Sequence, residues 1–355
     1  MSIIIFLLIL SLLVLVHEFG HFFAAKKQGI LVEEFGFGYP PRLLSIKIGE
    51  TVYSLNLIPL GGFVKVYGEE YQEKISKKLS SRSFSHKKPW QKALVLVAGI
   101  LGNFFLGWLL ISYLFTQGVP TPTNKIIIEQ VAKNSPAALA EIKEGDVVKS
   151  LIISNNKTNL HLKTAEELIK YSKKYAGQEI ILKIERNGKI LEKKLVPRKK
   201  PPAGQGPLGL AISSFEEKKY PWYQAPFYGL IEALNITKKI AVEVIKIIVQ
   251  FVSFKKPAVE VTGPIGIAHY TNKIVKFGKN AVLELIALLS LNLAIVNLLP
   301  FPALDGGRLV FVIYEWVTKR KVNKNFEKYL NLIGFILLLT LAAVISVNDI
   351  IRLTK

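Results

Sequence analysis

The 355-residue sequence contains no cysteine and only five histidines. The absence of cysteine excludes disulfide bonds and thiolate metal sites, and it removes redox chemistry as a guide to the compartment. Any metal site must therefore be built from a few imidazoles together with carboxylates.

Acidic residues are outnumbered, with 26 Asp and Glu against 47 Lys and Arg, which gives a formal charge of +21. Such a charge occurs in nucleic-acid-binding proteins, but the lysines are scattered over loops and a soluble insert, and no nucleic-acid motif accompanies them. Half of the residues are hydrophobic, and the mean hydropathy is +0.33. These values predict a membrane protein with several spans, whose basic loops mark the cytoplasmic side and contact anionic lipid.

The first 25 residues lack the features of a signal peptide. No basic residue precedes the apolar run, no small-residue cleavage site precedes Lys26, and the run is about twice as long as an ordinary signal core. We expect an uncleaved first span over residues 3–25.

Three further apolar segments predict spans at residues 93–115, 281–300 and 329–347. The loop at 26–92 is rich in Lys and Arg, whereas no basic residue precedes the first span, so we place this loop in the cytoplasm. Residues 222–254 are apolar but carry five charges, which favours an amphipathic helix in the membrane interface over a span. The charged positions are Glu232, Lys238, Lys239, Glu243 and Lys246.

Residues 31–68 alternate apolar and polar side chains between Gly and Pro, which predicts a β-hairpin region. Two interpretations stay open. The region is either a small cytoplasmic hairpin or a sheet beside the active site that offers an edge strand to an extended substrate.

Residues 119–213 form a charged insert with short strands, capped helices starting near Ser135 and Thr164, and an Asn187-Gly188 hairpin turn. The insert resembles a PDZ domain in its bacterial permuted form, a domain that binds peptides by strand addition. The predicted divisions of the chain are membrane core 1–118, PDZ-like domain 119–213, interfacial helix and linker 214–270, and membrane core 271–355.

The chemistry-bearing stretch is His17-Glu18-Phe19-Gly20-His21, inside the first span. On a helix the two histidines project from one face and can hold a zinc ion, while Glu18 can act as general base toward a water. An acid at the centre of a span costs about 2.5 kcal/mol or more, so these residues require a function or a partner.

A catalytic zinc usually takes three protein ligands, and Asp305 is the best candidate for the third. It lies at the cytoplasmic end of the third span, on the same side as the histidine pair if residues 222–254 do not cross. The other histidines fit poorly, because they lie in a Lys-rich loop, in the insert and before the third span (His86, His161 and His269). In the second span, Asn103 is expected to face the catalytic helix.

Three motifs together resemble the site-2 protease family, in its RseP-like branch with a PDZ insert: His17 to His21, Gly99 to Asn103, and Asn297-x-x-Pro300 leading to Leu304-Asp305-Gly306. The resemblance implies zinc held by His17, His21 and Asp305, with Glu18 as the catalytic acid/base. It also implies that Asn297 contacts the substrate backbone, and we group Asn103 with it as a substrate-binding candidate. A single PDZ-like unit is present, whereas some relatives carry two.

The resulting hypothesis is an α-helical integral membrane protein that acts as an intramembrane zinc metalloprotease in the inner (plasma) membrane. Its expected substrates are single-span proteins, such as anti-sigma factors or signal-peptide remnants, already shortened by an upstream site-1-type protease. The active site is expected toward the cytoplasm and the PDZ-like domain outside it. The alternative is a membrane-anchored PDZ adaptor with a non-catalytic metal site. A zinc transporter is a third idea, but it would need more acids along the spans than Glu284.

Overall fold

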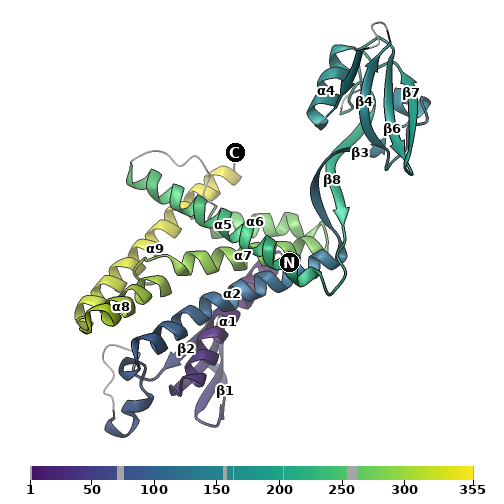
Figure 1. Ribbon diagram of the computed structural model, residues 1–355. Coiled ribbons are helices and arrows are strands. Elements are labelled where there is room, and N and C mark those ends of the chain that lie inside the picture. Colours follow the sequence, from purple (N-terminus) through teal and green to yellow (C-terminus); the bar gives the residue numbers. More distant parts are fainter. Residues whose placement is uncertain are drawn as a thin grey trace. The chain divides into compact units, whose positions relative to one another are not determined.

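The computed structural model describes residues 2–69, 76–154, 158–162, 164–202, 204–253 and 262–354. The chain divides into two compact units, which are described separately. Unit 1 contains Met1–Thr116 and Pro221–Lys355, and unit 2 contains Gln117–Tyr220 (Figure 1).

Four helices of unit 1 are long and apolar enough to cross a membrane. They are α1 (Ser2–Lys27), α2 (Pro89–Gln117), α7 (Lys279–Leu298) and α9 (Lys324–Leu353), and they coincide with the four predicted spans. The first three pack together: Ile9 and Leu13 of α1 meet Ile286 of α7, and Ile111 of α2 meets Leu291. Most side chains of α9 are exposed, as expected of a helix whose surface faces lipid.

Strands β1 (Val32–Ile48) and β2 (Thr51–Val66) form an antiparallel two-stranded sheet in the predicted hairpin region. The first half of β1 is paired on both sides, since Phe35 pairs with Val64 and with Tyr53. The outer half of β1 exposes aliphatic side chains at alternate positions, with Leu44, Ile46 and Ile48 each more than half exposed. Short helical turns η1 (Lys77–Arg82) and η2 (Phe84–His86) then lead into α2.

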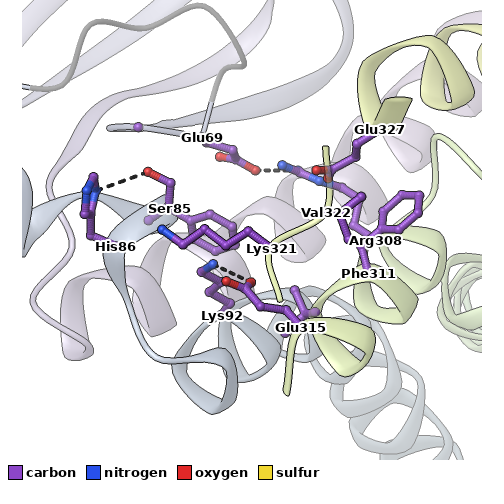
Figure 2. A pocket seen from close by; sticks show the side chains of 13 residues that line it. Glu69, Ser85, His86, Lys92, Arg308, Phe311, Glu315, Lys321, Val322 and Glu327 are labelled. Atoms are coloured by element: carbon purple, nitrogen blue, oxygen red, sulfur yellow. Dashed lines mark hydrogen bonds and ion pairs between the residues drawn. The ribbon is translucent and has the colours of Figure 1, made fainter. Parts of the chain in front are cut away.

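The prolines and glycines after α7 were expected to end or unwind the third span. Helix α7 does end at Leu298, but a new helix, α8 (Asp305–Thr318), begins six residues after the C-cap residue Leu299. One face of α8 docks on the N-terminal half of unit 1. Val312 enters a buried cluster with Ala25, Val32 and Leu96, and flanking ion pairs join Arg308 to Glu69 and Glu315 to Lys92 (Figure 2).

The segment predicted as interfacial helix and linker contains two helices, α5 (Ala225–Val252) and α6 (Pro264–Val275), while residues 254–261 of the linker lie outside the described residues. Helix α5 is not one of the four candidate spans. Its Ala233 packs against Ile111 and Leu291, and the indole N–H of Trp108 donates to the Pro226 carbonyl. Helix α6 was not predicted, because Pro264 reads equally well as a helix breaker and as a first helical residue.

Unit 2 is an α+β domain with a six-stranded antiparallel sheet of order β7-β6-β4-β3-β8, in which β5 pairs with β4. Its core is aliphatic and includes Ile128, Leu151 and Leu182. The predicted caps are present: Ser135 accepts from the Ala138 amide and Thr164 from the Glu167 amide. The elements are β3 (Val119–Val131), α3 (Pro136–Leu139), β4 (Val147–Ile153), β5 (Thr158–His161), α4 (Ala165–Lys174), β6 (Ile180–Arg186), β7 (Lys189–Leu195) and β8 (Leu210–Lys218).

Candidate metal centre

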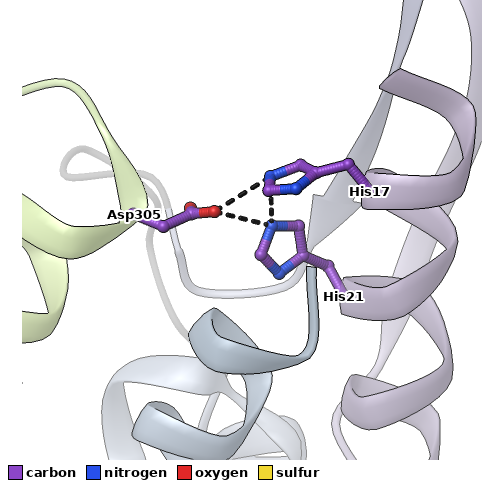
Figure 3. Close-up of side chains that lie close together, drawn as sticks. All are labelled: His17, His21 and Asp305. Atoms are coloured by element: carbon purple, nitrogen blue, oxygen red, sulfur yellow. Dashed lines mark hydrogen bonds and ion pairs between the residues drawn. The ribbon is translucent and has the colours of Figure 1, made fainter. Parts of the chain in front are cut away.

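His17 and His21 project from one face of α1, one turn apart, and Asp305 approaches them from the first turn of α8 (Figure 3). Asp305 Oδ2 lies 2.9 Å from His17 Nε2 and 3.2 Å from His21 Nε2, and the two Nε2 atoms are 3.1 Å apart. Two histidines four residues apart and an aspartate far along the sequence thus bring three donor atoms to one point.

This donor set fits a zinc ion. Tetrahedral zinc with bonds of 2.0–2.2 Å spaces its ligands about 3.3–3.6 Å apart, so the observed triangle needs only a small outward turn of the side chains. Asp305 Oδ2 is buried, and it has no hydrogen-bond partner among the described residues although it faces both imidazoles. A cation bound between the two imidazoles and this oxygen would neutralise the buried carboxylate. Within the described part of the chain, these three residues form the only cluster of His, Cys, Asp and Glu that could hold a metal.

The orientation of His21 is set by the neighbouring helix. Its Nδ1 lies 2.8 Å from the carbonyl oxygen of Val95 on α2. An N–H at Nδ1 donates to that carbonyl and leaves the lone pair of Nε2 for a metal. Asn297, near the end of α7, places its amide nitrogen 3.5 Å from both ring nitrogens of His17.

The histidines reach this position because α1 and α2 approach closely. A Cβ at Gly20 would lie 2.2 Å from the Ala98 carbonyl oxygen, and a Cβ at Gly99 would lie 2.4 Å from His21 Nε2. Both distances are far shorter than a carbon atom allows, so only glycine fits at either position. The Gly99 motif therefore provides the space that the two imidazoles occupy.

The loop between α7 and α8 holds Asp305 in place. A Cβ at Gly306 would overlap the carbonyl oxygens of Leu298 and Leu299, which shows how tightly the first turn of α8 folds back on the end of α7. The backbone N–H of Ala303 donates to Asn331 of α9, so a second span anchors the same loop.

Glu18 follows His17 on α1 and lies beside the sheet. Glu18 is half-buried. Its Cγ lies 3.9 Å from the point that a Cβ would occupy if Gly62 on β2 carried one. The position places a carboxylate between the histidine pair and the last part of β2.

Asn103 lies on α2, one turn after Gly99. It is fully buried where α2 meets α7, its backbone carbonyl accepts from Ser290, and its side-chain amide has no partner among the described residues. The Asn103 side chain is therefore not accessible to a substrate in this structure.

Sequence reasoning did not single out Val95, Asn331 or the ion pairs of α8. A backbone carbonyl carries no sequence signal, and the charged residues of the ion pairs read as ordinary loop and helix charges.

Comparisons with known proteins agree with this geometry. Residues 5–341 match the family described as Peptidase family M50. A Clostridium perfringens protein named as a zinc metalloprotease is 34% identical over 355 residues, covering 99% of this chain and 99% of that protein. A similarly named Clostridium acetobutylicum protein is 31% identical, covering 99% and 97%. The regulator of sigma-W protease RasP of Bacillus subtilis is 28% identical, covering 99% of each chain.

Proposed function

The chain belongs to peptidase family M50, the site-2 protease family, and on that premise we propose that it cleaves single-span membrane proteins within their transmembrane segments. It is a zinc metalloprotease and a membrane protein with four candidate spans. The convergence of His17, His21 and Asp305 carries the proposal. The alternative, a membrane-anchored adaptor with a non-catalytic metal site, is disfavoured because the family and its named relatives are proteases.

In the proposed mechanism His17, His21 and Asp305 hold the zinc, which when bound polarises the scissile carbonyl and acidifies the attacking water. Glu18 takes a proton from that water and delivers it to the leaving amine, so that one peptide bond and one water become a carboxylate and an amine. Asn297, beside His17, donates its amide N–H to the substrate backbone.

The substrate is proposed to bind along the end of β2. Residues 63–66 form one wall of a groove of about 710 Å³ whose other wall comes from the α7–α8 loop and α9 through Ala303, Lys328 and Phe335. A transmembrane helix hides its carbonyls in internal hydrogen bonds, so it must unwind before it can be cut. An unwound segment can replace those bonds by pairing with the outer edge of β2.

The proposed placement in the membrane is supported by the distribution of charge. Lys26 and Lys27 end α1, and the loop after β2 and the connection from α8 to α9 are basic, which supports a cytoplasmic position for the metal centre. Counting the four spans then puts unit 2 outside the cytoplasm. The aliphatic face of β1 dips into the membrane beside α1, and α5 lies in the opposite interface.

Unit 2 is proposed to act as a PDZ-like reader of substrate ends. Helix α4 and strand β8 border a groove of about 660 Å³, with Leu168 and Ile212 on its apolar lining and Arg198 and Lys199 at its edge. An upstream protease produces an extended chain that ends in a carboxylate. The apolar lining of the groove suits the side chains of such a chain, and the two basic residues suit its carboxylate. Substrates that retain a folded outer domain would not enter it.

The proposal is tested by Glu18→Gln in cells that carry a tagged single-span substrate. The variant should retain zinc and lose cleavage, so that uncut stubs accumulate in the membrane proteome. Glu284→Gln, which changes another acid in a spanning helix, should leave cleavage unchanged. Cleavage at the wild-type rate by Glu18→Gln would overturn the catalytic assignment.

A further inference from the structure

Asp305 reaches the histidines only because α8 is docked against the N-terminal half of unit 1. The docking residues follow Asp305 at intervals of three, seven and ten positions, which places Arg308, Val312 and Glu315 along one side of the helix. Of these three residues, Val312 makes an apolar contact, whereas Arg308 and Glu315 make ion pairs.

Each ion pair joins α8 to a segment that also supports the active site. Arg308, one turn after Asp305, donates to Glu69, which lies three residues after the end of β2. Glu315 accepts from Lys92, which lies 2.8 Å away in the first turn of α2, the helix that orients His21 through Val95. Figure 2 shows both pairs on the wall of a single cavity of about 280 Å³.

These pairs are not ordinary surface contacts. The Lys92 side chain is 8% exposed and that of Glu315 19%, and Arg308 and Glu69 are each about a quarter exposed. A charge at such burial is costly without its partner, so each pair resists separation of the surfaces that carry it. Beside the apolar contact of Val312, a cavity leaves part of this surface unfilled, and the two ion pairs lie on its wall.

We propose that the Arg308–Glu69 and Glu315–Lys92 ion pairs are positioning contacts that hold the third zinc ligand, Asp305, against His17 and His21. The inference rests on the proposed role of Asp305 as a ligand. None of the four positioning residues belongs to the ligand cluster. Lys92 and Glu315 lie outside the proposed substrate groove, whereas Arg308 and Glu69 also line it. They set the angle of α8, and with it the distance from the Asp305 carboxylate to the two imidazoles.

Zinc affinity, measured by competition with a chromophoric chelator in purified full-length protein, tests this directly. Glu69→Arg and Arg308→Glu should each weaken zinc binding about tenfold, and the double variant with exchanged charges should recover most of that loss. Lys92→Glu and Glu315→Lys should behave in the same way. The matched control is the exposed Arg82–Glu50 pair, where Glu50→Arg should leave zinc affinity unchanged.

A crosslink separates positioning from general damage. Because the chain has no cysteine, Glu69→Cys with Arg308→Cys provides the only two thiols for a short bis-maleimide. The unlinked double variant should bind zinc weakly, and linking should restore the affinity. If the charge-exchanged variants show no recovery and the crosslink restores nothing, the positioning role is overturned.

Asp305→Asn distinguishes this failure from failure of the underlying assignment. If Asp305→Asn itself binds zinc as the wild type does, Asp305 is not a ligand and the proposed site is wrong. If Asp305→Asn loses zinc while all four single ion-pair variants retain it, the site stands and the positioning inference falls.

Discussion

The Nδ1 atom of His21 lies 2.8 Å from the carbonyl oxygen of Val95, which ties an imidazole of the candidate metal centre on α1 to the backbone of α2. One turn later on α2, Gly99 leaves room for the same ring. Helix α2 therefore contacts the His21 ring at one residue and leaves space for it one turn later, although α2 contributes no residue to the candidate ligand cluster.

Gly99→Ala should consequently damage the metal centre without altering any ligand. Its new methyl group would lie 2.4 Å from His21 Nε2 and 2.9 Å from His17 Cε1, so one or both rings must turn. We expect zinc affinity to fall at least tenfold, the size of effect seen when outer contacts of metal ligands are lost. Chelator competition measures the change. Gly206→Ala, which adds the same methyl group in open space, is the control, and wild-type affinity of Gly99→Ala would contradict the packing argument.

Much of this centre could be predicted from the sequence, for specific reasons. His17 and His21 are four residues apart, and helical periodicity alone places them on one face. Asp305 followed from the order of spans, which puts the ends of the first and third spans on the same side. The first argument uses a local sequence pattern and the second uses the order of the spans, and a single sequence contains both kinds of information.

The support of Asp305 could not be predicted in that way. Glu69 and Arg308 are 239 positions apart, and Lys92 and Glu315 are 223 positions apart. Nothing local distinguishes these residues from other charges. Helix α8 was not predicted, because two prolines precede it and two glycines lie in its first turn. These residues end α7, but they also permit the tight turn into the next helix.

The aliphatic face of β1 should lie in lipid. Ile46 is 62% exposed between two other exposed aliphatic residues, whereas Ser45 projects from the opposite face of the strand. In this cysteine-free chain, Ile46→Cys should resist a water-soluble maleimide in intact membranes, and Ser45→Cys should react several times faster. Equal reaction of both thiols would place the hairpin in water and remove the membrane-associated interpretation.

Asp349 should control the attachment of α6. Its buried carboxylate, at the end of the last span, accepts from the backbone N–H groups of Gly263 at 3.0 Å and Gly266 at 2.8 Å. Asp349→Ala would leave two buried donors unpaired, at a cost of about 2 kcal/mol or more. Hydrogen exchange at the amides of 263–266 should become much faster, while the neighbouring exposed change Asn348→Ala should have no effect. Unchanged protection in Asp349→Ala would show that α6 is held by other contacts.

The stability of unit 2 should depend on pH through Asp146. Burial alone would raise the pKa of Asp146, but two hydrogen bonds from Arg186 and one from the Lys143 amide outweigh it, and the pKa is below its usual value. A carboxyl group with a lowered folded-state pKa contributes stability above its unfolded pKa of about 3.9 and loses it as the pH falls through the folded pKa. Arg186→Met should therefore destabilise unit 2 by about 2 kcal/mol at neutral pH, because Asp146 remains buried without its cation.

Hydrogen exchange of unit 2 within the full-length protein can follow this difference across pH. Wild type and Arg186→Met should differ most near neutral pH. The difference should narrow as the pH falls, first as the Asp146 carboxyl of the variant takes up a proton and then as that of the wild type, whose pKa Arg186 lowers, does so. The exposed pair of Lys183 and Glu192 on the same sheet provides the control, since Lys183→Met should change stability little at any pH. A difference that stays constant down to pH 3 would mean that Arg186 stabilises the sheet by packing and not through the charge of Asp146.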